Sequence, residues 1–180
     1  MVATVIINII TGAAAGATTD ITGINTRANA QDAHSTGDIT NPIEIPAAGT
    51  NYSFWRVTRL EATVAPDNLI DNIEWFTDGS NTYGIGITNV MNTATAYVQA
   101  TGTDGVTGIE LTVGNYATLA GAPTDSFAFT TGSPKVVAGS TSTAVEFGDR
   151  AVFQVQVGTT ATAGTKPATP ETFTYRFDET

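Results

Sequence analysis

Alternation of apolar and polar residues marks three segments of the chain as strands. Residues 106–113 (VTGIELTV), 151–157 (AVFQVQV) and 172–178 (TFTYRFD) place apolar side chains at every second position. A period of two puts those side chains on one face of a strand and the polar ones on the other. We therefore predict antiparallel strands over these segments, each with one buried and one solvated face.

Weaker patterns extend the strand prediction along the chain. They cover residues 52–64, 73–76, 83–88, 95–100, 126–130 and 144–147. Residues 2–10 (VATVIINII) are interpreted as a strand rather than a secretion leader, because no Lys or Arg precedes the run and Asn8 lies inside it. Residues 42–46 (PIEIP) alternate between two prolines, which is typical of an edge strand.

Two Asp-Gly pairs predict tight turns. Asp78-Gly79 separates the strands predicted at 73–76 and 83–88, and Asp104-Gly105 separates those at 95–100 and 106–113. Asp-Gly accommodates the positive φ angles of hairpin turns, so two hairpins are expected.

The one helix that the sequence predicts is a turn or two over residues 66–71 (PDNLID), where proline and aspartate suit the first helical positions. Roughly nine short strands with so little helix indicate an all-β fold. We predict an antiparallel β-sandwich or jelly-roll-like body, with an extended N-terminal arm.

The aromatic residues divide the chain into parts. All fifteen follow residue 51, so the first 51 residues have no large side chain around which to build a separate core. We predict a strand and extended arm over 1–50, a β-sandwich body over 51–157, a linker over 158–171 and a terminal strand over 172–180. On the arm, three isoleucines are expected to dock on a larger surface: Ile21, Ile24 and Ile39. The terminal strand either completes the body or pairs with a neighbouring molecule.

Composition excludes several classes of protein. The 180 residues carry a net charge of −10, which repels phosphate backbones and argues against nucleic-acid binding. There is no cysteine, and 34 residues are threonine. Disulfides, thiolate zinc sites and cysteine nucleophiles are therefore excluded. No apolar stretch approaches the ~20 residues of a membrane-spanning helix, so no membrane association is expected.

Candidate catalytic residues are few. His34 is the sole histidine and lies in a polar stretch of the arm, without a predicted pocket or an orienting partner. Asp67, Asp71, Glu74 and Asp78 are close in sequence but lack the spacing of a calcium loop, and we interpret them as solvated charges. We predict no enzyme, no catalytic residues, no cofactor and no metal site.

Two tryptophans offer a possible binding surface. Trp55 follows Tyr52 and Phe54, and Trp75 precedes Phe76. Exposed tryptophans stack on sugars or anchor a protein partner, whereas alternation within a strand would bury part of each group in the core. Burial is the favoured interpretation, and a glycan or partner contact remains the alternative.

Three segments resemble virion structural proteins of tailed bacteriophages, of the capsid decoration or cement type. They are residues 21–26 (ITGINT), 42–47 (PIEIPA) and 52–56 (YSFWR). The resemblance implies a non-enzymatic protein on the capsid exterior, dimeric or trimeric, that clamps the major capsid protein or other virion subunits. It assigns no individual binding residue. The alternative is a cell-surface adhesin, filament subunit or binding module, located outside the cell.

A mechanical role follows from the predicted parts. The arm or the terminal strand would pair with an exposed sheet edge of a neighbour, so that main-chain hydrogen bonds set the register. The expected interface residues are Ile21, Ile24, Trp55, Phe173, Tyr175 and Phe177. If the arm is separate from the body, a chain lacking residues 1–41 should remain soluble and folded.

Overall fold

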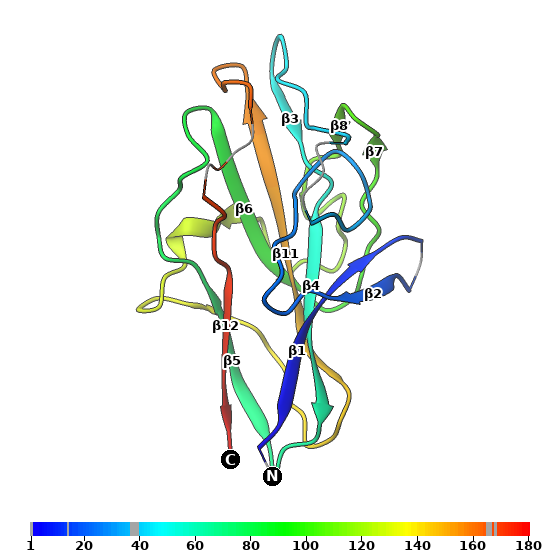
Figure 1. The fold of residues 1–180 in the computed structure, drawn as a ribbon, viewed down its shortest axis with the longest axis vertical. Helices are drawn as coiled ribbons and strands as arrows, with labels where there is room; N and C mark the ends of the chain where they lie inside the picture. Colours follow the sequence, from blue (N-terminus) through cyan, green and yellow to red (C-terminus); the bar gives the residue numbers. More distant parts are fainter. Residues whose placement is uncertain (1, 14, 37–39, 165–166, 168) are drawn as a thin grey trace.

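The protein is all-β, as the alternation predicts. The structure, a computed structural model, describes residues 2–13, 15–36, 40–164, 167 and 169–180. Within these residues the regular elements are strands and one short 3-10 helix, Ser126–Ala128. Figure 1 shows the longer strands running along the long axis of the molecule. None of the helical structure described is long and apolar enough to cross a membrane.

The larger sheet is antiparallel and has the strand order β2-β1-β4-β11-β6-β9, with β3 also paired to β11. Its strands are β1 (Thr4–Thr11), β2 (Ala17–Asp20), β3 (Thr50–Tyr52), β4 (Arg56–Val64), β6 (Ile87–Ala94), β9 (Thr124–Asp125) and β11 (Glu146–Gly158). Because β11 is the longest strand and pairs with three others, it forms the centre of this sheet.

A smaller sheet packs against one face of the larger one. It has the order β10-β5-β12, with β10 at Lys135–Val136, β5 at Ile70–Phe76 and β12 at Thr174–Glu179. Leu60, Ile73, Trp75 and Phe153 share the core between the two sheets. The result is a sandwich-like arrangement in which the small sheet covers part of the large one.

Loops cover part of the other face of the larger sheet. Trp55 is 3% exposed and packs on Tyr116 with 5.4 Å between the ring centroids, while its indole N–H donates to Val98 O at 2.9 Å. Ile10 and Val152 belong to the same core cluster. The predicted burial of Trp55 is confirmed, and so is that of Trp75, which is 1% exposed.

The strand prediction at 106–113 is largely wrong, for a physical reason. Only Thr107–Gly108 (β8) pairs there, with Gly102–Thr103 (β7). The side chain of Gln154, fully buried in β11, accepts from Leu111 N at 2.7 Å and donates to Ile109 O and Ser53 O at 2.8 Å. These backbone groups therefore bond to a buried amide instead of a neighbouring strand. The alternation predicts that Gln154 faces solvent, and this prediction is wrong.

Of the other local predictions, one hairpin is confirmed and several elements are wrong. The hairpin at Asp104-Gly105 is confirmed as the β7–β8 pair. The hairpin at Asp78-Gly79 is wrong, because the strands on either side, β5 and β6, lie in different sheets. The helix predicted at 66–71 is absent, and its last two residues begin β5 instead. The strands predicted at 42–46 and 95–100 are absent as well. The strand at 126–130 is replaced by the 3-10 helix, which Asp125 caps by accepting from Phe127 N.

The segment predicted as strand and arm is tied into the large sheet. β1 lies between β2 and β4, and its Ile9 and Ile10 are buried. Further along, Ala30 is buried in the core beside Phe54, and Phe54 N donates to Asn29 O at 3.0 Å. The described part of residues 1–50 thus contributes β1, β2 and a core-covering loop to the same body.

Arg56 fixes this loop. Its fully buried guanidinium donates to Arg27 O at 2.9 Å, to Gln31 O at 3.1 Å and to Asn29 Oδ1. Burial lowers the pKa of Arg56 to about 10, while the charge of Asp32 opposes the change. Three acceptors from one loop thus compensate a buried cation.

The terminal strand pairs within its own chain. β12 is antiparallel to β5, with Tyr175 opposite Trp75. Phe173 packs on Trp75 and on Phe153, with ring centroids 5.1 and 5.0 Å apart. Of the two placements left open by the sequence, the structure has the strand completing the body.

Candidate functional site

The predicted interface residues are mostly internal. Trp55 and Ile21 are buried, and Phe173, Tyr175 and Phe177 pack against the core between the sheets. Tyr175 also makes a 2.9 Å hydrogen bond with Thr58 Oγ1. Ile24 alone of the six is exposed, at 48%. Ile39, the third isoleucine expected to dock, lies outside the described residues.

The groups considered for chemistry do not converge. His34 Nδ1 lies 3.2 Å from Thr26 Oγ1, and burial together with the charge of Arg56 lowers the pKa of His34. Glu74 forms an ion pair with Arg176. Among the described residues, no three His, Asp or Glu side chains gather in an arrangement that could hold a metal ion.

Two surface hollows have volumes of about 230 and 270 Å³, below the range usual for small-molecule sites. The first contains Asp78 and the second Glu110 as its sole carboxylate. Neither hollow therefore holds the carboxylate pair that glycoside hydrolysis requires.

The strands at the sheet edges differ in how they are protected. Edge strands offer unpaired backbone groups to other chains, and proteins usually block them with proline, charge, bulges or very short length. β9 and β10 are two residues long and follow Pro123 and Pro134, respectively, and β10 contains Lys135. β12 has a bulge between Arg176 and Asp178 and is rich in charge.

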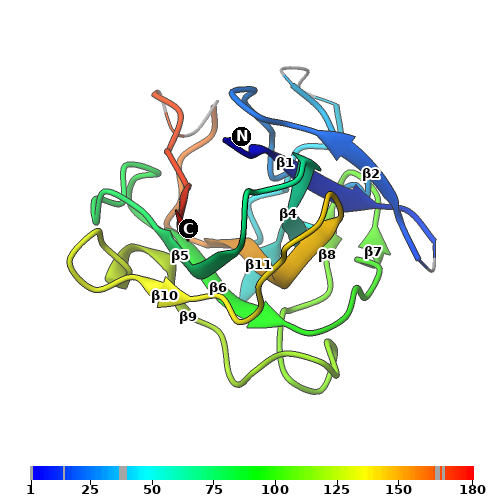
Figure 2. The ribbon, with the colours of Figure 1, turned by 90° about the horizontal axis from the view of Figure 1, so that it is seen from below.

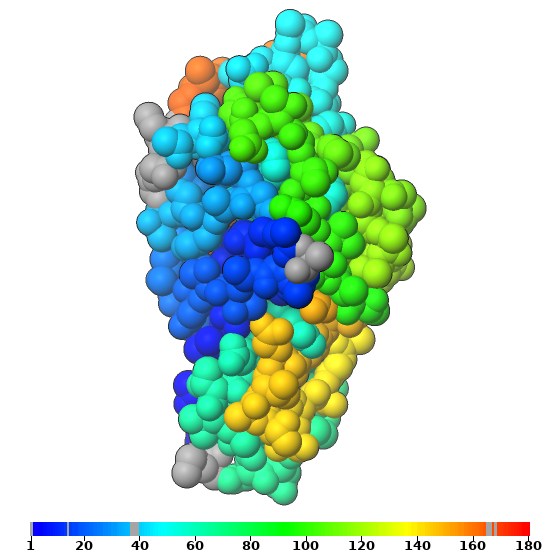
Figure 3. Space-filling model, turned by 90° about the vertical axis from the view of Figure 1, so that its right-hand side faces the viewer, coloured from blue at the N-terminus to red at the C-terminus, as the bar shows by residue number. Residues whose placement is uncertain are grey.

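β3 and the β7–β8 pair lack proline, lysine and a bulge, but they are only three and two residues long. β2 is the longest described edge strand that lacks these protections. Its residues Ala17, Thr18, Thr19 and Asp20 are all exposed, and their one charge is at the end. The pairing with β1 is regular, and no described residue pairs with its outer side. β2 lies at the outer rim of the molecule in Figure 2, and Figure 3 shows the N-terminal hairpin at the surface.

The direction of the backbone groups follows from the register. Ile21 N donates to Ile7 O at 2.8 Å, in continuation of the β1–β2 pairing. Since antiparallel residues alternate between bonding inward and outward, Thr19 and Ala17 bond to β1 as Ile21 does. The N–H and C=O groups of Thr18 and Asp20 therefore point away from the sheet.

The body holds the β1–β2 turn in place. Gly12 N donates to Asp32 Oδ2 at 3.0 Å, and Gly12 O accepts from the Tyr97 hydroxyl at 2.7 Å. Gly16 has φ +69°, and a Cβ there would lie 2.3 Å from Ile10 Cγ2. The turn requires glycine at position 16, and the two hydrogen bonds at Gly12 tie its first part to the body.

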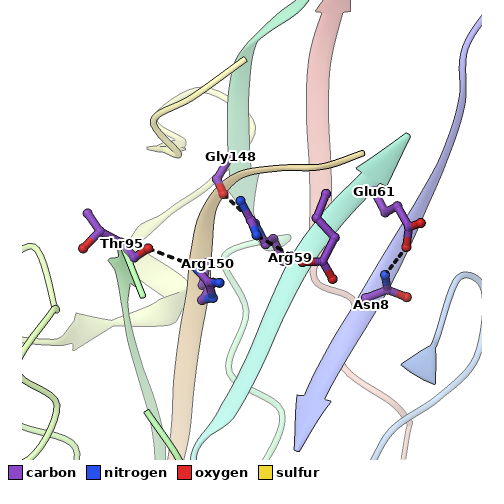
Figure 4. Close-up of polar contacts among 7 residues, drawn as sticks. Asn8, Arg59, Glu61, Thr95, Gly148 and Arg150 are labelled. Carbon is purple, nitrogen blue, oxygen red and sulfur yellow. Dashed lines mark hydrogen bonds and ion pairs between the residues drawn. The ribbon is translucent and has the colours of Figure 1, made fainter. Parts of the chain in front are cut away.

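A row of polar side chains crosses the large sheet toward β2 (Figure 4). Asn8 on β1 donates to Glu61 Oε2 at 2.6 Å, and Arg59 donates to Gly148 O at 2.9 Å and forms an ion pair with Glu146. Arg150 donates to Thr95 O at 2.8 Å. Burial, followed by the nearby charge of Arg59, lowers the pKa of Arg150. The charged side chains drawn here are thus engaged in hydrogen bonds or ion pairs within the chain.

Sequence reasoning missed β2 because its pattern is short and polar. Four residues with no apolar alternation give no strand signal. The available signal was the pair Gly12 and Gly16, which both have positive φ and bound a turn directly after the apolar run of β1.

Comparison of the chain with protein-family models, with curated proteins and with solved structures finds no match. Its function is therefore inferred from the geometry of the open sheet edge.

Proposed function

We propose that this chain is a non-enzymatic structural protein that binds neighbouring subunits of an assembly through the open edge of β2. The observation that carries the proposal is the contrast between β2 and the other edge strands. The other described edge strands contain or follow proline or lysine, carry a bulge, or are only two or three residues long, whereas β2 has a regular, exposed edge of four residues. An edge left open when others are protected is a site for strand addition.

Strand addition at β2 would extend the large sheet by one strand from another molecule. The outward N–H and C=O groups of Thr18 and Asp20 supply the main-chain hydrogen bonds, and the register follows from them. Because Asp32 and Tyr97 already hold the turn, little conformational entropy is lost when the partner binds.

The assembly that we propose is a virion, with this chain as a decoration or cement protein on the capsid exterior. Support comes from the resemblance of residues 21–26, 42–47 and 52–56 to such proteins and from the acidic composition, which suits a surface away from nucleic acid. The partner would be the major capsid protein or another virion subunit.

The second candidate is a cell-surface filament subunit or adhesin, since strand addition also joins subunits of filaments. The open edge of β2 favours the filament form over a glycan-binding module. A glycan would stack on exposed aromatic rings, and Trp55 and Trp75 are 3% and 1% exposed.

Site-specific photo-crosslinking in the cells that produce the assembly tests the proposal. Thr18→benzoylphenylalanine places the photoreactive group on β2, and Val136→benzoylphenylalanine on β10 is the matched control, because Val136 is 68% exposed on a protected edge. We expect position 18 to give a discrete product with one structural protein of the assembly, identified by mass spectrometry. A product with a filament protein would favour the second candidate over a virion.

The proposal requires that the product depends on backbone pairing. Thr18→Pro removes the outward N–H of β2 while leaving the bonds of Thr19 and Ala17 to β1 intact. A chain with this change and a photoreactive group at Asp20 should lose the product. Equal products from positions 18 and 136 would contradict strand addition at β2.

A further inference from the structure

We infer that the strand added to β2 is the β2 strand of a second copy, related by a two-fold axis through the pair of Thr19 residues. The inference rests on the proposed function and specifies its partner. Two copies would then join their large sheets into one continuous antiparallel sheet.

The outward backbone groups allow few registers. Thr18 and Asp20 are the outward-facing residues of β2, so each must lie opposite an outward-facing residue of the second copy. Placing Thr18 opposite Asp20 of the second copy meets this condition, and the two-fold axis repeats the same pair on its other side. Each Thr18–Asp20 pair then exchanges two main-chain hydrogen bonds, giving four bonds in total.

Two other symmetric registers are disfavoured. Placing Asp20 opposite Asp20 sets two like charges directly across the axis. The other is disfavoured by a glycine. Placing Thr18 opposite Thr18 puts Asp20 opposite Gly16 of the second copy. Gly16 has φ +69°, outside the extended region, and its N–H already donates to Ala13 O at 2.8 Å. This register therefore retains one complete hydrogen-bonded residue pair, whereas the register with Thr18 opposite Asp20 retains two.

Side-chain chemistry favours the same register. Thr19 meets Thr19 across the axis as a non-hydrogen-bonded pair, and threonine pairs of this kind stabilise antiparallel sheets. Thr18 lies on the same face as Asp20 of the second copy, so its hydroxyl can donate to the carboxylate. Hydrogen bonds from Thr22 lower the pKa of Asp20, which keeps this acceptor ionised.

The interface is small and the copies repel one another. A four-residue strand forms few contacts compared with a stable dimer interface. Each chain carries a net charge of −10, so screening by salt should favour association. The pair is therefore expected to be weak in dilute solution and to form at high concentration, as on a particle surface.

Disulfide trapping tests the register directly, because the natural chain has no cysteine. In the proposed register the Cβ atoms of the two Thr19 residues lie about 4.5 Å apart, within reach of a disulfide. The matched control is Ala17, which lies opposite Ile21. The Ala17 residues of the two chains are therefore offset from one another by four residues, about 13 Å along the strands.

Under mild oxidation of the full chain, we expect Thr19→Cys to form a disulfide dimer about tenfold faster than Ala17→Cys, because pairing raises the effective concentration of the thiols. Adding salt should increase the rate for position 19. Adding Thr18→Pro to the Thr19→Cys chain should reduce its rate to that of position 17, and circular dichroism would verify that each variant is folded.

Equal rates at positions 17 and 19, at any salt or protein concentration, would overturn the two-fold pairing. This result is distinguishable from failure of the proposed function. If photo-crosslinking at Thr18 still captures a different structural protein, strand addition holds and only the identity of the partner is wrong. If neither experiment gives a product, both proposals fail.

Discussion

At the scale of single residues, buried polar side chains position the loops of this protein. Gln154 holds two loops through three hydrogen bonds, and Arg56 holds the loop at 27–31 through three others. Each replaces backbone pairing that a strand would otherwise provide. A buried amide or guanidinium of this kind stabilises the fold only while its partners are present.

The role of Arg56 leads to a stability prediction. Arg56→Leu should lower the free energy of unfolding by about 3 kcal/mol, because Arg27 O, Gln31 O and Asn29 Oδ1 would be left buried without their donor. Urea unfolding followed by tryptophan fluorescence measures the change. Arg176→Gln is the control: it breaks an exposed ion pair with Glu74, for which a loss below about 1 kcal/mol is expected. Equal losses from the two variants would contradict the assigned role.

At the scale of elements, the sequence predicts strands well where the pattern alone decides the structure. The alternation at 151–157 falls within β11, and β12 covers that at 172–178 from Thr174 onward. It fails where a distant residue competes for the backbone, as Gln154 does at Ile109 and Leu111. No local pattern announces such a partner, because 43 residues separate Leu111 from Gln154.

The turn and edge predictions fail for a related reason. Asp78-Gly79 suits a hairpin locally, yet the chain there crosses from the small sheet to the large one. Trp75 on β5 and Met91 on β6 belong to one core cluster between the sheets, and the packing of that core is not encoded in the turn itself. The candidate site was missed similarly, because the open edge of β2 is defined by the absence of a neighbour rather than by its own residues.

The position of β1 inside the large sheet reverses the expected effect of deleting residues 1–41. A chain lacking residues 1–41 should be unfolded, since it loses an inner strand and the buried Ile9 and Ile10, each worth about 2 kcal/mol of burial. Far-ultraviolet circular dichroism and the tryptophan emission maximum measure this. Removal of residues 1–3 alone is the control and should leave a cooperative transition. If the chain lacking residues 1–41 is folded instead, this segment is an arm separate from the body, as the sequence predicts.

At the scale of the whole molecule, the two sheets form one body whose described edges are nearly all protected. The small sheet ends in the charged β12 and in β10 with its lysine, and the large sheet ends in short β9. β2 is the exception, and the turn before it is bonded at Gly12 to Asp32 and Tyr97. We propose that another molecule extends the large sheet at this edge.

Amide hydrogen exchange at single-residue resolution tests the occupancy of that edge most directly. In the dilute chain, the Thr18 and Asp20 amides should exchange rapidly, while Thr19, whose amide faces β1, should be protected. In the assembled protein, with exchange quenched before dissociation, we expect the Thr18 and Asp20 amides to become protected as strongly as that of Thr19. Rapid exchange of Thr18 and Asp20 in the assembled state would contradict assembly through β2.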